Sequence, residues 1–339
     1  MHPIFKFREK ETQGILDLLN AVTLGTNGAH YRHLDTNERI LEADHPLFLS
    51  MERNGTTLGN VTFCRRERNW YIRYFAFSNA LQSSGKRASK SGMKNRLKQE
   101  IERFFETGLN GKSEWGEIDS FYAYIDPKNE KSLWMSASFG FKTIGHVATQ
   151  TYSRVKPKHS ERLQKIQAWD EVAPIINATF QSYLHFATAQ TKKPPFYVLR
   201  NLEGEIVAAA KTSISRWEIH RFPGKLGGVL TKIIPFIPRL NQIVNPKEHA
   251  FVVPEAVYIK DNDPELLNEL FEGILHQESK NLILWWVGEQ APLYIQVKSK
   301  MNWGLLHKII GVHKVNIVER SRLENDSSTP FYTSGFDFI

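Results

Sequence analysis

The chain has 339 residues, 41% of them hydrophobic and 24% charged, and a formal net charge of +8 at pH 7. This is the composition of a folded protein of about two domains, at roughly 150 residues per domain. No run of about 18 apolar residues occurs, so the sequence predicts no membrane-spanning helix. Residues 1–8 lack the apolar core of a secretion signal, and the single cysteine, Cys64, rules out an internal disulfide and a multi-cysteine metal site. We therefore expect a cytoplasmic protein without a metal, with Cys64 as a small core side chain.

The first 80 residues predict a helix followed by three strands. Residues 13–20 form a short amphipathic helix. Two apolar runs, at 47–53 and 56–63, flank Asn54-Gly55, which is the strongest short signal for a hairpin. Residues 70–77 give the third apolar strand.

A cation-rich loop and a long helix come next. Apolar residues recur between 93 and 105 at helical spacing, which predicts one buried stripe with the basic side chains on the other face. The basic side chains are Lys86, Arg87, Lys90, Lys94, Arg96, Lys98 and Arg103. A solvated helix face, nucleic-acid binding and a phosphorylated cofactor would each account for this charge. RNA-binding aromatic motifs and helix-turn-helix spacing are not evident, so we favour the cofactor over a nucleic-acid partner.

Residues 121–141 predict a strand, a tight turn and a helix. Pro127 fixes its own φ and keeps Asp126 out of helical space, so the strand ends there. Asn129 is a helix-start signal and Gly140 a helix-stop signal. A strand end and a helix N-terminus then meet at one crevice, which suits an anionic or thioester ligand. A purely structural unit is the alternative.

The same order of elements repeats after residue 154. Helices at 171–177 and 264–277, a hairpin at 196–208, and strands at 255–260 and 282–287 match those of the first half. The sequence thus predicts two tandem α/β (α+β) domains, each with a mixed, mostly antiparallel sheet flanked by helices. We place them at 1–154 and 164–339, with a polar, basic linker at 155–163.

The second unit differs from the first in two places. It carries an insertion at 221–249, which is a packed surface loop or else a lid or dimer contact. Its strand-to-helix junction at 261–265 has three acidic side chains and no glycine. Those charges would oppose an anion at the helix N-terminus, so we expect the second unit to have lost a phosphate site.

The motif Asp126-Pro-x-Asn129-x-x-Ser132 with the ending Phe139-Gly140-Phe141 resembles the C-terminal half of a GCN5-related N-acetyltransferase (GNAT) domain. In that family this strand and helix clasp the pantetheine arm of acetyl-CoA. The resemblance therefore implies acetyl-CoA, or another acyl-CoA, as cosubstrate. It also implies a tandem-domain member with a degenerate second domain.

The resemblance further implies a pyrophosphate loop, Gln/Arg-x-x-Gly-x-Gly/Ala, before the long helix. Residues 87–92 match it with Lys90 in place of the middle glycine, and residues 82–87 give a second, poorer frame. We prefer the first because Gly92 directly precedes the helical stripe. The implied cofactor-binding residues are Phe77, Ser78, Arg87, Ala88, Ser89, Lys90, Ser91, Gly92, Met93, Asn129 and Ser132.

The catalytic residues stay unassigned. The usual acid of the family is a Tyr four residues before the glycine of the Gly-Phe ending, and Ser136 stands at that position here. A serine hydroxyl is a poor acid for a leaving thiolate. Glu67 and Glu117 are candidate bases, and His30 and His33 are candidate substrate contacts, although a core or surface role is commoner for a histidine.

Three functions remain open. The first is an acyl-CoA-dependent N-acyltransferase that transfers an acetyl group to a primary amine held between the domains. The second is a non-catalytic module that binds a CoA-like ligand or a partner. The third is an aminoacyl or peptidyl transferase using aminoacyl-tRNA, similar to the peptidoglycan-bridge enzymes. The acceptor could be a small amine, an antibiotic, an amino acid or a peptide N-terminus. We expect a monomer or homodimer without a membrane partner.

Overall fold

The computed structural model describes residues 4–25, 29–78, 92–222, 226–323 and 328–339, with only the backbone of 92–97. The first half contains β1 (Phe5–Arg8), α1 (Gln13–Asn20), β2 (His30–His33), α2 (Thr36–Glu42), β3 (Pro46–Arg53), β4 (Thr56–Arg66), β5 (Asn69–Phe77), α4 (Gly92–Leu109), β6 (Ser120–Ile125), α5 (Glu130–Ser138) and β7 (Lys142–Ser153). The second half contains β8 (Leu163–Ile166), α6 (Trp169–Phe180), α7 (Thr188–Thr191), β9 (Phe196–Arg200), β10 (Ile206–Arg221), α8 (Gly227–Ile233), η2 (Ile234–Phe236), α9 (Leu240–Ile243), β11 (His249–Ile259), η3 (Lys260–Asn262), α10 (Pro264–Gln277), β12 (Leu282–Gly288), α11 (Pro292–Val297), α12 (Leu305–Ile310), β13 (His313–Ser321) and η4 (Gly335–Phe338).

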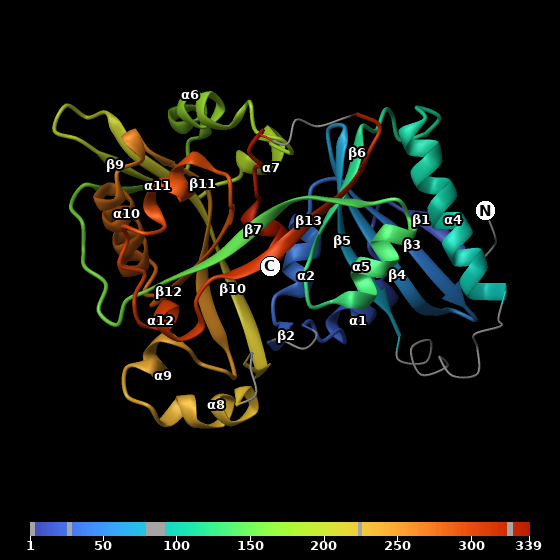
Figure 1. Ribbon diagram of the computed structural model, residues 1–339, viewed down its shortest axis with the longest axis horizontal. Coiled ribbons are helices and arrows are strands. Elements are labelled where there is room, and N and C mark those ends of the chain that lie inside the picture. Colours follow the sequence, from blue (N-terminus) through green and yellow to red (C-terminus); the bar gives the residue numbers. More distant parts are fainter. Residues whose placement is uncertain (1–3, 26–28, 79–91, 223–225, 324–327) are drawn as a thin grey trace.

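The described strands form one continuous, mostly antiparallel sheet with helices on both faces (Figure 1). Its order is β1-β3-β4-β5-β6-β13-β7-β12-β11-β10-β9-β8, and β2 pairs with β10 off this path. The α/β class and the helix–hairpin–strand–helix order predicted for both halves are confirmed. Among the described residues, no helix is long and apolar enough to cross a membrane.

The two halves exchange their last strands. β13, at the end of the second half, pairs with β6 of the first half on one side and with β7 on the other. β7, at the end of the first half, pairs in turn with β12 of the second half. Figure 1 shows β7 and β13 running side by side through the middle of the molecule. The boundaries at 154 and 164 stay predictions about the order along the chain, because in space each half completes the sheet of the other.

Local sequence signals account for the β3–β4 hairpin turn and for both ends of α5. Asn54 and Gly55 both have positive φ, at 52° and 77°, as a two-residue hairpin between β3 and β4 requires. Asn129 caps α5 because its side-chain oxygen accepts a hydrogen bond from the Ser132 N–H at 3.1 Å. Gly140, with φ of 75°, ends that helix as predicted.

Both halves contain a bulge followed by two parallel strands that part. In the first half, β4 and β5 shift register at Arg73, and β5 then pairs with β6 only from Asn69 to Tyr71. In the second half, β10 and β11 shift register near Ala256, whose φ is 50°, and β11 pairs with β12 only at Val252. A bulge bends its strand and increases the local twist, which helps separate it from its neighbour. Each half therefore has the same arrangement, a bulge beside two parallel strands that part, as the repeat in the sequence predicts.

Separate apolar clusters hold the halves around the shared sheet. In the first half, Phe63, Trp70 and Phe121 pack under α4 through Phe105. In the second half, α10 packs against β9 to β12, with Phe271 near its centre. Fully burying each such side chain contributes about 1.5–3 kcal/mol to folding.

Candidate functional site

The first opening lies between β5 and β6. After the pair Tyr71–Tyr122, the two parallel strands are no longer paired, yet β5 runs on to Phe77 and β6 to Ile125. The far edge of β5 stays paired with β4 as far as Phe77. Its near edge therefore presents backbone N–H and C=O groups that β6 does not use, and these suit an extended ligand with amide groups.

Buried polar groups without partners gather on β5 beside this opening. Nε and Nη1 of Arg73, the hydroxyl of Tyr74 and the hydroxyl of Ser78 have no hydrogen-bond partner among the described residues. Buried polar groups are nearly always bonded, so these donors are available to a bound molecule. The Arg73 guanidinium also stacks on the Phe336 ring at 4.2 Å and bonds to the backbone oxygen of Ile339. The residues present thus fit a polar, extended ligand such as the pantetheine arm of an acyl-CoA.

Several residues predicted to bind the cofactor surround the opening. Phe77 ends β5 and Ser78 follows it, while Gly92 begins α4, so the helix predicted from Met93 is confirmed. Asn129 and Ser132 form the first turn of α5, at the end of β6. Arg87, Ala88, Ser89, Lys90 and Ser91 lie outside the described residues.

Ser136 is tied to its own helix. Its hydroxyl donates to the backbone oxygen of Leu133 at 2.9 Å. The two candidate bases lie at the other end of β5 from the opening. Glu67 is in the turn that joins β4 and β5, and Glu117 is an exposed partner of Arg68. Their carboxylates therefore do not belong to this site.

A buried network that the sequence did not reveal lies where β5 and β6 part. The Arg66 guanidinium binds the Asp337 carboxylate through two hydrogen bonds and donates to the Tyr122 hydroxyl at 2.9 Å. Burial raises the pKa of Asp337, although Arg66 partly offsets this. The His185 ring stacks on Tyr122 at 3.9 Å, and its Nε2 lies 2.9 Å from Oε1 of Glu319. No short-range signal could have found the network, because Arg66 and Asp337 are 271 positions apart.

His33 lies where the two halves meet, because β2 pairs with β10. Tyr31, His33 and Trp217 stack together, with ring centres 4.1 Å apart for Tyr31 and Trp217 and 5.3 Å apart for His33 and Trp217. Both ring nitrogens of His33 are buried without a partner among the described residues. Burial, with help from the charges of Arg73 and Arg39, lowers the pKa of His33 to about 3. His30, the first residue of β2, is instead only half-buried and lies opposite Arg221 of β10.

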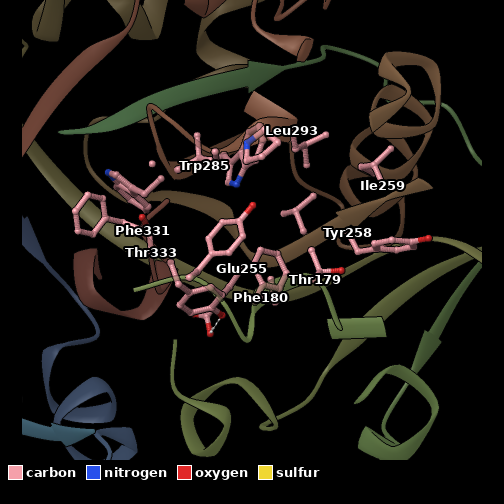
Figure 2. A pocket seen from close by; sticks show the side chains of 18 of the residues that line it. Thr179, Phe180, Glu255, Tyr258, Ile259, Trp285, Leu293, Phe331 and Thr333 are labelled. Carbon is pink, nitrogen blue, oxygen red and sulfur yellow. Dashed lines mark hydrogen bonds between the residues drawn. The ribbon is translucent and has the colours of Figure 1, made fainter. Parts of the chain in front are cut away.

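A second cavity of about 260 Å³ lies between the parted strands β11 and β12 (Figure 2). Figure 2 shows Trp285 and Leu293 on one side of it and Phe180 and Glu255 on the other. Oxygens of the Glu255 carboxylate accept from Lys211 at 3.1 Å, Tyr332 at 3.1 Å and Ser334 at 2.6 Å. The lining of the cavity is mainly apolar and aromatic, and the buried Glu255 charge is paired with Lys211.

The second cavity lacks the phosphate-binding features of a CoA site. The N-terminus of α10 is capped by Asp263, whose carboxylate accepts from the Glu265 N–H at 2.9 Å. Packed aromatic rings lie between this cavity and β6. Trp286 stacks on Phe338 at 4.8 Å, and Phe338 packs on Tyr124 of β6 at 4.5 Å. Within the described ranges, no group of His, Cys, Asp and Glu side chains is placed to hold a metal ion.

No protein-family model and no curated protein matches the sequence. Solved structures do match its fold. Saccharomyces cerevisiae N-myristoyltransferase with bound myristoyl-CoA is 10% identical, with 97% of this chain and 84% of that chain covered and a TM-score of 0.55. A putative acetyltransferase from Pyrococcus horikoshii is 9% identical, with 99% and 96% covered and a TM-score of 0.52. A tandem GNAT protein from the clavulanic acid biosynthesis pathway is 10% identical, with 95% and 100% covered and a TM-score of 0.51. The chain therefore has the tandem-domain fold of the GCN5-related N-acetyltransferase superfamily.

Proposed function

We propose that this protein is an acyl-CoA-dependent N-acyltransferase that acts on a primary amine, with acetyl-CoA as the first donor to test. The observation that carries the proposal is the opening between β5 and β6, where β5 is no longer paired with β6 and buried donors lack partners among the described residues. The similarity in fold to an N-myristoyltransferase with bound myristoyl-CoA supports an acyl-CoA donor. The fold alone does not determine which acyl group the protein transfers.

In this proposal the pantetheine arm lies along the free edge of β5 and the CoA phosphates lie at the N-terminus of α4. The backbone N–H groups of residues 88–93 and the charges of Arg87 and Lys90 would hold the phosphates. Tyr74 and Ser78 would donate hydrogen bonds to the arm, and Asn129 would line its other side. Bound acyl-CoA supplies an activated thioester carbonyl.

The reaction is a direct transfer. The amine nitrogen attacks the thioester carbonyl, a C–N bond forms, the C–S bond breaks, and a proton passes from the amine to the leaving thiolate by way of groups in the site. A backbone N–H of β5 near Phe77 would stabilise the charge that develops on the carbonyl oxygen. His33, neutral at pH 7 because of its lowered pKa, would accept a hydrogen bond from the amine and orient it.

We place the acceptor where the two halves meet, beside β2 and β10, with its apolar part in the cavity between β11 and β12. The aromatic walls favour an apolar or aromatic group, and the acidic residues of the adjoining junction favour a positive charge. Leu293→Trp, which fills this cavity, should raise the KM of such an amine and leave the affinity for acyl-CoA unchanged.

The test of the donor site is calorimetric titration with acetyl-CoA and longer acyl-CoAs. Gly92→Asp should abolish binding, because it places a carboxylate beside the phosphates. Asn110→Asp is the control: it adds the same carboxylate at an exposed position just beyond the other end of the same helix, where the backbone does not require glycine. It should bind acyl-CoA normally. Equal affinity in the two variants would contradict the placement.

Release of free CoA in the presence of a panel of amines distinguishes an enzyme from a binding module. Ser136→Ala should leave the rate constant almost unchanged, because the hydroxyl already donates to Leu133 and is a poor acid. A hundredfold loss with unchanged acyl-CoA affinity would show that Ser136 takes part in the chemistry. Binding of aminoacyl-tRNA in place of acyl-CoA would instead favour the aminoacyl-transferase alternative.

A further inference from the structure

The insertion predicted at 221–249 forms a helical projection at the end of β10. It contains α8, η2 and α9 and stands out at the lower side of the molecule in Figure 1. Its inner face packs on the core through Leu230, Ile234 and Ile237. Packing in the core thus accounts for the apolar side chains on the inner face of α8 and η2.

The outer face of the same segment is also apolar. Leu226, Val229, Ile233 and Phe236 are 68%, 52%, 45% and 83% exposed. They follow one another at i, i+3, i+7 and i+10, so they form a single stripe along one side of the helix. Single exposed apolar side chains are ordinary, but a contiguous stripe of large ones marks an interaction surface.

The charge of the projection is entirely positive. Residues 219–247 contain no Asp or Glu, and their basic residues are Arg221, Lys225, Lys232, Arg239 and Lys247. The four that the structure describes are exposed, and none of them forms an ion pair within the described part of the chain. Some surface arginines elsewhere, such as Arg32 and Arg216, are paired with glutamates.

These two properties together identify the kind of partner. An exposed apolar stripe flanked by unpaired cations is the pattern of a segment that lies in the interface of an anionic bilayer. The four side chains expose only on the order of 500 Å², against about 800 Å² per partner in a stable protein–protein interface. A lipid surface has no such minimum area, because the bilayer adapts to the side chains.

We propose that residues 226–239 dock this protein on the surface of an anionic lipid bilayer. Leu226, Val229, Ile233 and Phe236 enter the interface, and Lys232 and Arg239 contact lipid phosphates. This binding is peripheral, and it departs from the expectation that the protein has no membrane partner. It does not depend on acyl transfer. It does bring the bilayer beside β2, because the strand that leads into the projection pairs with His30 at Arg221.

The experiment is co-sedimentation of the full chain with vesicles. One set is pure phosphatidylcholine, and the other contains one part phosphatidylglycerol to two parts phosphatidylcholine. The protein should bind the second set and dissociate at high salt. The double variant Val229→Asn/Phe236→Asn should lose at least about tenfold in partitioning, since the apolar contribution scales with buried area. Lys232→Gln and Arg239→Gln should each lose about fivefold.

Leu202→Asn is the matched control. Leu202 is 99% exposed in the turn at the other end of β10, and it should leave vesicle binding unchanged. All variants change exposed side chains, and unchanged melting temperatures will show that they fold. Absence of binding to the anionic vesicles, or equal binding by the double variant and the parent, overturns the proposal. A dimer in gel filtration that the double variant dissociates, without any vesicle binding, would assign the surface to a second copy and would also overturn it.

Discussion

Replacing Asp337 with alanine should destabilise the protein severely, because it leaves the Arg66 charge buried and unpaired. Both side chains are almost fully buried, and the carboxylate accepts two hydrogen bonds from the guanidinium, one of them 2.8 Å long. Breaking a buried pair by removing one partner costs about 3–5 kcal/mol in the free energy of unfolding. The hydrogen bond from Arg66 to Tyr122 remains, so we expect the lower part of this range.

A double-mutant cycle separates the unpaired charge from lost packing. Its corners are the parent, Arg66→Met, Asp337→Leu and the double variant Arg66→Met/Asp337→Leu. The double variant removes both charges and keeps apolar volume, so it should be at least about 2 kcal/mol more stable than Asp337→Leu alone. Urea unfolding at pH 7, followed by tryptophan fluorescence, measures each step. Glu218→Ala is the control, since it breaks an exposed pair with Arg32 and should cost no more than about 1 kcal/mol.

Two results would refute this reasoning. One is a cost below about 1 kcal/mol for Asp337→Ala, which would mean that water reaches Arg66. The other is a double variant as unstable as the sum of the single variants, which would mean that the two charges do not interact.

Two further predictions concern buried groups and backbone. His33 is neutral when folded, with a pKa lowered from 6.5 to about 3, so unfolding takes up a proton and stability falls as the pH drops from 6.5 towards 3, by up to about 1.4 kcal/mol per pH unit. His33→Gln should remove only the part of the slope that His33 contributes, in urea titrations at several pH values, and should leave the part due to His249, whose pKa burial lowers to about 4 and which contributes only down to about that pH; a His33→Gln curve parallel to the parent would contradict the assignment. Gly304→Ala should cost more than Gly311→Ala in thermal unfolding, because both have positive φ but a Cβ at Gly304 would lie 2.1 Å from the backbone oxygen of Ser153 while one at Gly311 meets open space. Equal losses would show that the contact relaxes freely.

Local signals in the sequence predicted most elements and the repeat. Asn54-Gly55, Asn129 and Gly140 each fix a turn or a helix end within a few residues, so their effect can be read from the neighbouring sequence. The meeting of a strand end and a helix start at Asp126 to Asn129 was predicted because Pro127 and Asn129 act within a few residues of each other. β2 was missed, since four residues with two histidines carry no clear period.

The network around Arg66 could not be predicted for a different reason. Its members Asp337, Tyr122 and His185 come from distant parts of the chain and meet only when the sheet is complete. Nothing near any of them in the sequence marks it as a partner of the others. Long-range electrostatic pairs of this kind need either a structure or an alignment that shows the positions changing together.

The exchange of last strands has a consequence for synthesis. Ile125 of β6 faces Asn316 of β13, so the sheet of the first half lacks a neighbour until almost the whole chain has left the ribosome. Until then, β6 presents an open edge that another chain could occupy. The first 154 residues made alone should therefore aggregate or stay partly folded, and adding residues 313–321 as a separate peptide should increase their solubility. Neither half of the gene therefore encodes a unit with a complete sheet, because each half needs the last strand of the other.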